Sequence, residues 1–126
     1  MHTILIQVED ISIKAELNES KTSNMVWNEL PLHSKVNLWG DEIYFDTGLN
    51  AELEPDSSDI VTSGDIAYWP PGAAFCIFYG PTPASLGDEI RAASAVNIIG
   101  TVKADESIFR KVNNGSTISV SRIIGA

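Results

Sequence analysis

The sequence is poor in cysteine and in positive charge, and each shortage excludes a class of protein. Its 126 residues include a single cysteine, Cys76, so no disulfide can form within the chain. Cys76 stands between Phe75 and Ile77, a setting that predicts a buried, reduced thiol. Eight Lys and Arg face 17 Asp and Glu, a formal net charge of −9. Because nucleic acids are densely negative and the chain has no basic stripe, we expect no nucleic-acid partner.

Long apolar runs are also missing. No run approaches the roughly 18–20 residues that a membrane span requires, so we expect no membrane partner. The opening residues, MHTILIQVED, lack the basic segment and cleavage site of a signal peptide. These two absences predict a cytoplasmic protein.

Motifs for metal, phosphate or nucleophilic chemistry are absent as well. The two histidines, His2 and His33, do not form an H-x-H pair, so we expect no metal site and no cofactor. The chain contains no G-x-S-x-G, no P-loop and no C-x-x-C motif. Asp41 and Glu42 are adjacent, and neighbouring side chains on a strand point in opposite directions, so they cannot act as a carboxylate pair.

What the sequence does contain is a series of short β-rich segments, which predicts one mainly β domain over residues 1–126. Alternation is clearest in Ile11–Leu17, where apolar residues occupy every second position. A long loop is expected over Gly80–Ala95. The expected strands are Thr3–Val8, Ile11–Leu17, Asp41–Asp46, Ala51–Glu54, Ile60–Val61, Ile66–Trp69, Phe75–Tyr79, Val96–Lys103 and Ser116–Ile124. Short strands at this spacing are typical of a closed barrel or a sandwich.

Two short helices are expected between the strands. One lies within Asn18–Leu30, where Ser20 or Thr22 can cap the first turn and Pro31 prevents continuation. The other covers Asp105–Val112.

Several motifs, taken in order, resemble a known family. They are LPL (30–32), WGDEIYF (39–45), GDIAYWPPG (64–72), FYGPTP (78–83) and VNIIG (96–100). Together they resemble the small prokaryotic cyclophilin-like family, a domain family of unknown function, over nearly the whole chain. The resemblance implies a cyclophilin-like closed antiparallel β-barrel of about eight strands with two short capping helices.

The resemblance does not carry prolyl isomerase machinery with it. True cyclophilins use an arginine at the prolyl amide, beside hydrogen-bonding glutamines. The arginines here, Arg91, Arg110 and Arg122, lie outside the aromatic strands, and the one glutamine is Gln7. We therefore do not expect peptidyl-prolyl cis-trans isomerase activity, which remains an alternative.

Strand alternation indicates where a ligand could bind. In Asp41–Asp46, Ile43 and Phe45 share the core face, so Glu42 and Tyr44 face solvent or a cleft. We predict an aromatic-lined cleft that binds a small molecule or peptide. Its candidate residues are Glu42, Tyr44, Tyr68, Trp69, Phe78, Tyr79, Pro81 and Thr82.

Each candidate also has a plainer interpretation. Glu42 is either a solvated strand charge or a cleft carboxylate that orients a ligand or acts as acid or base. Trp39 and Trp69 either pack in the core or stack on a planar ligand. Three hypotheses therefore stand: a binding protein, an enzyme of unknown reaction using Glu42, or an interaction module that forms a homo-oligomer.

Overall fold

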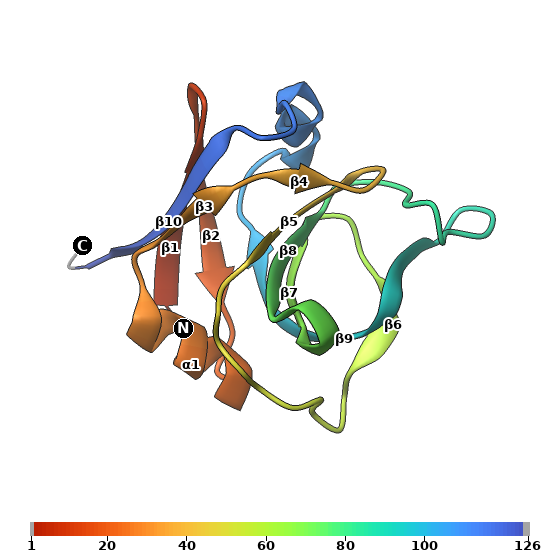
Figure 1. Ribbon diagram of the computed structural model, residues 1–126, viewed down its shortest axis with the longest axis horizontal. Coiled ribbons are helices and arrows are strands. Elements are labelled where there is room, and N and C mark those ends of the chain that lie inside the picture. Colours follow the sequence, from red (N-terminus) through yellow and green to blue (C-terminus); the bar gives the residue numbers. More distant parts are fainter. Residues whose placement is uncertain (1, 125–126) are drawn as a thin grey trace.

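The computed structural model describes residues 2–124, and β-strands are its main secondary structure (Figure 1). Every recorded strand pair is antiparallel. The strands are β1 (His2–Val8), β2 (Ile11–Leu17), β3 (Leu32–Lys35), β4 (Asn37–Leu38), β5 (Glu42–Asp46), β6 (Ser58–Val61), β7 (Asp65–Trp69), β8 (Ala74–Phe78), β9 (Ile90–Val102) and β10 (Thr117–Ile123).

The sheet follows the order β3-β10-β1-β2-β9-β7-β8-β5-β4, with β6 paired to β9. The expectation of a closed barrel of about eight strands is wrong, because among residues 2–124 no ladder joins the β3 edge to the β4 edge, and ten strands are present. The reason is local. β3 and β4 follow one another along the chain, separated by Val36. The Val36 N–H donates to the Ser116 carbonyl, and its carbonyl accepts from the Gly115 N–H, so Val36 bonds to the turn before β10.

Both expected helical segments exist, and they differ in type. Helix α1 spans Lys21–Glu29, and the Ser20 hydroxyl accepts a hydrogen bond from the Ser23 N–H at 3.2 Å, which confirms Ser20 as the cap. The segment expected over 105–112 is a 3₁₀ helix, η2 (Glu106–Lys111), capped by the Asp105 carboxylate. A further 3₁₀ turn, η1 (Pro70–Gly72), links β7 to β8.

One strand prediction and one loop prediction need correction. Ala51–Glu54 is not a strand but part of the connection from β5 to β6. The loop expected over Gly80–Ala95 ends at residue 89, because β9 begins at Ile90. Residues 91–95 are Arg-Ala-Ala-Ser-Ala, which have weak strand preference by themselves. Pairing of β9 with β6 imposes the strand there.

The sheet buries apolar side chains on both of its faces. The main core lies inside the curved sheet and includes Ile4, Ile13, Phe45 and Phe109. A smaller cluster covers the other face of β7 and β8: Val61, Ala67, Ala74, Cys76, Phe78, Ala92 and Val96. All five residues of β8 are consequently buried. The first half of β9 and β6 cover this second face, on the side of the molecule away from α1 (Figure 1).

Candidate functional site

A cavity of about 200 Å³ opens beside the smaller cluster. It is lined by Trp39, Glu42, Tyr44, Trp69, Ala92, Ala93 and Val96, and we call it the Glu42 cavity. β5 contributes Glu42 and Tyr44 through its period of two, β7 ends at Trp69, and β9 supplies the small residues of the opposite wall. Three predicted site residues, Glu42, Tyr44 and Trp69, are thus brought together.

Glu42 is the one acidic side chain of this lining, and it is buried. Its side chain is 6% exposed, so the interpretation as a solvated strand charge is wrong. Burial raises the pKa of Glu42 to about 7, and the neighbouring Cys76 thiol acts in the opposite direction, lowering the pKa of Glu42. The same burial, with the charge of Glu42, raises the pKa of Cys76, so this buried thiol stays protonated at neutral pH.

No ion pair among residues 2–124 reaches the Glu42 carboxylate, and the chain's three arginines are engaged elsewhere. Arg91 pairs with Asp59 and Glu89, Arg110 pairs with Asp41, and Arg122 donates to the Trp27 and Asn28 carbonyls. The cavity therefore holds a titratable carboxyl group without a cation from the described chain.

The aromatic walls differ in how firmly they are fixed. Trp69 Nε1 donates to Ser94 Oγ at 2.7 Å, which ties the end of β7 to β9. Trp39 Nε1 and the Tyr44 hydroxyl make no hydrogen bond within the described residues. Both groups are half-buried and can meet a ligand.

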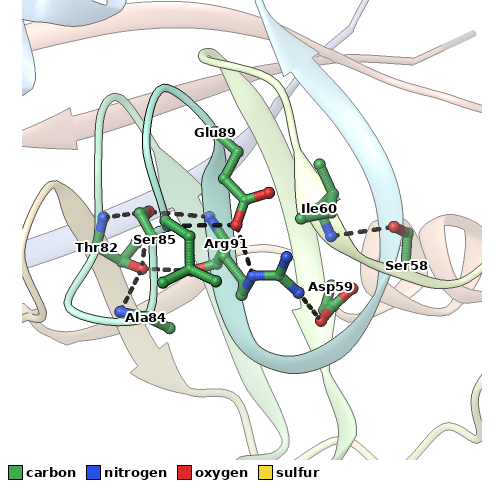
Figure 2. Close-up of polar contacts among 9 residues, drawn as sticks. Ser58, Asp59, Ile60, Thr82, Ala84, Ser85, Glu89 and Arg91 are labelled. Atoms are coloured by element: carbon green, nitrogen blue, oxygen red, sulfur yellow. Dashed lines mark hydrogen bonds and ion pairs between the residues drawn. The ribbon is translucent and has the colours of Figure 1, made fainter.

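A polar network joins the loop before β9 to β9 and to β6 (Figure 2). Ser85 Oγ accepts from the Thr82 and Arg91 N–H groups at 2.9 and 3.1 Å, and the Thr82 hydroxyl donates to the Arg91 carbonyl. The Arg91 guanidinium donates to Glu89 at 2.7 Å and to Asp59, on β6, at 2.6 Å. The loop, β9 and β6 are thus linked through one arginine.

The remaining predicted site residues are not among those that line the cavity. Thr82 is 7% exposed and serves the network just described, and Pro81 is exposed, with its carbonyl accepting from the Asp41 N–H. Phe78 packs in the smaller cluster. Any ligand contact by these residues stays a prediction.

Tyr68 and Tyr79 belong to the main core instead. The Tyr68 hydroxyl donates to the Leu49 carbonyl and accepts from the Ala51 N–H at 3.1 Å. Tyr79 lies 6.0 Å from the Phe109 ring, and burial together with the charge of Asp41 raises the pKa of Tyr79 to about 12. The Tyr68 hydroxyl thus bonds to the segment around Leu49, and a part for either tyrosine in ligand binding stays a prediction.

Sequence reasoning missed the β9 wall of the cavity. Ala92 and Ala93 fall in the segment expected to be a loop, and Val96 was expected only as the start of a strand. The sequence marks Trp39 as a stacking candidate but gives no strand alternation that places it beside Glu42. The signal that could have found the wall is the apolar outer face of Cys76 and Phe78, which needs a covering element.

Neither a metal-ligand cluster nor a membrane-spanning helix occurs among residues 2–124. Within residues 2–124, no three His, Cys, Asp or Glu side chains gather as a group that could hold a metal ion. None of the helices in that part of the chain has the length and apolar character needed to cross a membrane.

Comparison with known proteins shows that the chain is similar to cyclophilin-like proteins. The family described as cyclophilin-like matches residues 2–121. The solution structure of a hypothetical protein from Archaeoglobus fulgidus is 39% identical, covers 97% of this chain and 95% of its own, and superposes with a TM-score of 0.81. McbB in complex with tryptophan is 16% identical, with a TM-score of 0.73 over 98% of this chain and 45% of its own, a likeness of fold. No curated protein gives a significant match.

Proposed function

The chain belongs to the cyclophilin-like family, and we propose that it is a binding protein that takes up a small organic molecule in the Glu42 cavity. The observation that carries this proposal is the combination of an open apolar cavity with one buried, unpaired carboxyl group. Ligand sites in proteins are typically concave and mostly apolar, with few polar groups that orient the ligand.

The size of the cavity favours a small molecule over a peptide. An engineered cavity of about 150 Å³ in another protein takes up benzene. At about 200 Å³, the Glu42 cavity has room for one ring with a short substituent. A peptide segment would have to leave most of its length outside.

The aromatic lining favours a planar ligand. Trp39, Tyr44 and Trp69 offer ring faces for stacking, and aromatic pairs contribute about 0.5–1.5 kcal/mol beyond the area they bury. McbB was solved with tryptophan. At its low identity that ligand does not transfer to this chain, but it is a reason to include aromatic molecules among the first probes.

Nuclear magnetic resonance with a library of single-ring compounds tests the proposal. We expect compounds that bind to shift the indole N–H signals of Trp39 and Trp69. The signal of Trp27 serves as an internal control, because Trp27 stacks on His2 with ring centroids 4.0 Å apart, outside the lining. Shifts confined to Trp27, or no shifts across the library, would overturn the proposal.

A cavity-filling variant gives an independent check. Ala92 is 3% exposed and lines the cavity, so Ala92→Leu places three extra carbon atoms in the ligand's space. We expect affinity for the library compounds to fall at least about tenfold, which corresponds to ~1.4 kcal/mol. Ala104→Leu, at an exposed position outside the lining, is the matched control and should bind as the natural chain does.

One observation favours a second candidate function, an enzyme with Glu42 as general acid or base. A carboxyl group whose pKa is raised to about 7 is suited to proton transfer near neutral pH. In this case ionised Glu42 removes a proton from carbon beside a ligand carbonyl and then returns one.

Deuterium exchange separates the two functions. Library compounds with such a carbon acid are incubated with the protein in D₂O, and loss of the C–H signal is followed. Exchange that Glu42→Gln abolishes identifies the enzyme. Absence of exchange, with affinity of neutral apolar compounds for Glu42→Gln kept within about tenfold, identifies the binding protein.

A further inference from the structure

We propose that the ligand of the Glu42 cavity is an organic cation, an amine or amidine carried on a single ring, whose charged nitrogen binds the Glu42 carboxylate. This inference rests on the proposed function and names its ligand class. It follows from three features of the cavity: the charge of its one carboxyl group, the character of its walls, and the charges of the groups around it.

Glu42 is a buried carboxyl group that lines the cavity and lacks a cation from residues 2–124. An isolated buried charge is costly unless it is paired, and the usual response is a raised pKa. A ligand cation in the cavity would pair with it directly. Charge-assisted hydrogen bonds of this kind are about twice as strong as neutral ones.

The walls suit the same class of ligand. The rings of Trp39, Tyr44 and Trp69 surround the space that Glu42 faces. Aromatic faces attract cations, with Trp the best of the three ring types, and the attraction grows when water is excluded. An amine on a ring can therefore use the carboxylate and the aromatic walls at once.

The surrounding groups add no positive charge to oppose a cation. The titratable neighbours of Glu42 are the Cys76 thiol on β8, the Tyr79 hydroxyl just after β8, and Asp41 and Tyr44 along its own segment. Arg110 acts on Tyr79 but is paired with Asp41 at 2.8 Å. On β9, Arg91 is paired with Asp59 and Glu89. The net charge of −9 further disfavours an anionic ligand.

The pairing predicts a particular dependence on pH. A charged amine selects the ionised form of Glu42, whose population rises as pH increases through about 7. Its affinity should therefore increase about tenfold from about pH 6 to about pH 8. A neutral molecule of the same shape selects the protonated form, and its affinity should fall over the same range.

Three probes of equal ring size test the inference: 2-phenylethylamine, 2-phenylethanol and 3-phenylpropanoate. Dissociation constants are measured from the Trp39 and Trp69 indole signals at the two pH values. At about pH 8, we expect the amine to bind at least about tenfold more tightly than the alcohol, and the carboxylate to bind most weakly. The opposite pH dependences of amine and alcohol are the second expected result.

Variants assign the effect to Glu42. Glu42→Gln should reduce the amine's affinity to that of the alcohol and remove its dependence on pH. Glu52→Gln removes the same charge from an exposed loop position and should change neither. Circular dichroism verifies that both variants fold, and the alcohol's retained affinity for Glu42→Gln shows that the cavity is intact.

The failures are distinguishable. If the alcohol binds as tightly as the amine at about pH 8, or the carboxylate binds best, the cation inference is overturned while the cavity remains a binding site. If none of the three probes perturbs Trp39 or Trp69, the proposed function fails together with the inference.

Discussion

Folding and ligand binding place opposite demands on the Glu42 side chain. A buried carboxyl group without a cation weakens the fold when it ionises, whereas a ligand cation would require it to be ionised. Because the pKa of Glu42 is raised from 4.5 to about 7, the folded state holds a proton that the unfolded chain releases. Stability contributed by this proton is complete at acidic pH and is lost as pH rises from about 4.5 to about 7.

The first prediction concerns this loss. A rise in pKa from 4.5 to about 7 corresponds to about 3 kcal/mol of unfolding free energy. Relative to the natural chain, Glu42→Gln should become more stable as pH rises from about 5 to about 8. We expect the total gain in unfolding free energy over this range to be about this large, as measured by urea denaturation. Glu52→Gln should show no such gain. A difference between Glu42→Gln and the natural chain that stays constant with pH would show that the carboxyl group is not desolvated.

Among the elements, β9 holds the molecule together, because it pairs with β2, β6 and β7. Asn97, on this strand, also fixes the connection from β5 to β6. Its side chain is 1% exposed, accepts from the Glu54 N–H at 2.8 Å, and donates to the Glu52 carbonyl and the Thr22 hydroxyl at 2.9 and 3.0 Å. One amide therefore joins a strand, a loop and helix α1.

The second prediction follows from this arrangement. Asn97→Leu keeps the size of the side chain but removes the partner of the Glu54 N–H and the Glu52 carbonyl, both in part-buried hydrogen bonds, while the Thr22 hydroxyl keeps its bond to the Glu54 carboxylate. A buried polar group left without its partner costs about 1–3 kcal/mol, so we expect a loss of about 2 kcal/mol in unfolding free energy. Asn24→Leu, on the exposed side of α1, is the matched control, and a change within about 0.5 kcal/mol is expected for it. Equal effects for the two variants would contradict the structural role of Asn97.

How well the sequence predicts an element depends on where the stabilising contacts of that element lie. The alternation of Ile11–Leu17 predicts β2 correctly, because its apolar positions are the ones that the main core buries. Sequence alone missed the first half of β9, where strand structure comes from pairing with β6 rather than from residue preference. The prediction that the sheet closes into a barrel was wrong. β3 and β4 form the two edges of the sheet and are joined by the chain rather than by a hydrogen-bonded ladder, and nothing in these short segments indicates this.

The sequence predicts one wall of the candidate site, on β5, but not the opposite wall, on β9. Period two on β5 correctly placed Ile43 and Phe45 in the main core and left Glu42 and Tyr44 on the opposite face. It could not reveal that Ala92 would cover that face, since small apolar residues carry no chemical signal and lie about 50 residues away in sequence. The burial of Glu42 therefore emerges only from the fold.

On the scale of the whole molecule, the positions of the arginines argue against prolyl isomerisation. Arg91, Arg110 and Arg122 are held by other groups, and none of them is among the residues that line the cavity. True cyclophilins use an arginine at the prolyl amide, and we expect no arginine of this chain to take that role.

The third prediction is that the protein does not accelerate cis-trans exchange of a proline-containing peptide. The uncatalysed reaction takes about 10–100 s at 25 °C, so a catalysed increase in its rate is easily measured by following the isomerisation over time. A true cyclophilin in the same assay provides the positive control. Acceleration by catalytic amounts of this protein, removed by a cyclophilin-type inhibitor, would contradict the prediction.

Carbon-13 nuclear magnetic resonance of the Glu42 carboxyl carbon, followed against pH, tests the central claim of a buried, unpaired carboxyl group in a ligand cavity. In the free protein we predict a titration midpoint of about 7, and with saturating 2-phenylethylamine a midpoint moved to lower pH. A midpoint near 4.5 in the free protein, unchanged by the amine, would mean that Glu42 is solvated or already paired, and would contradict the account.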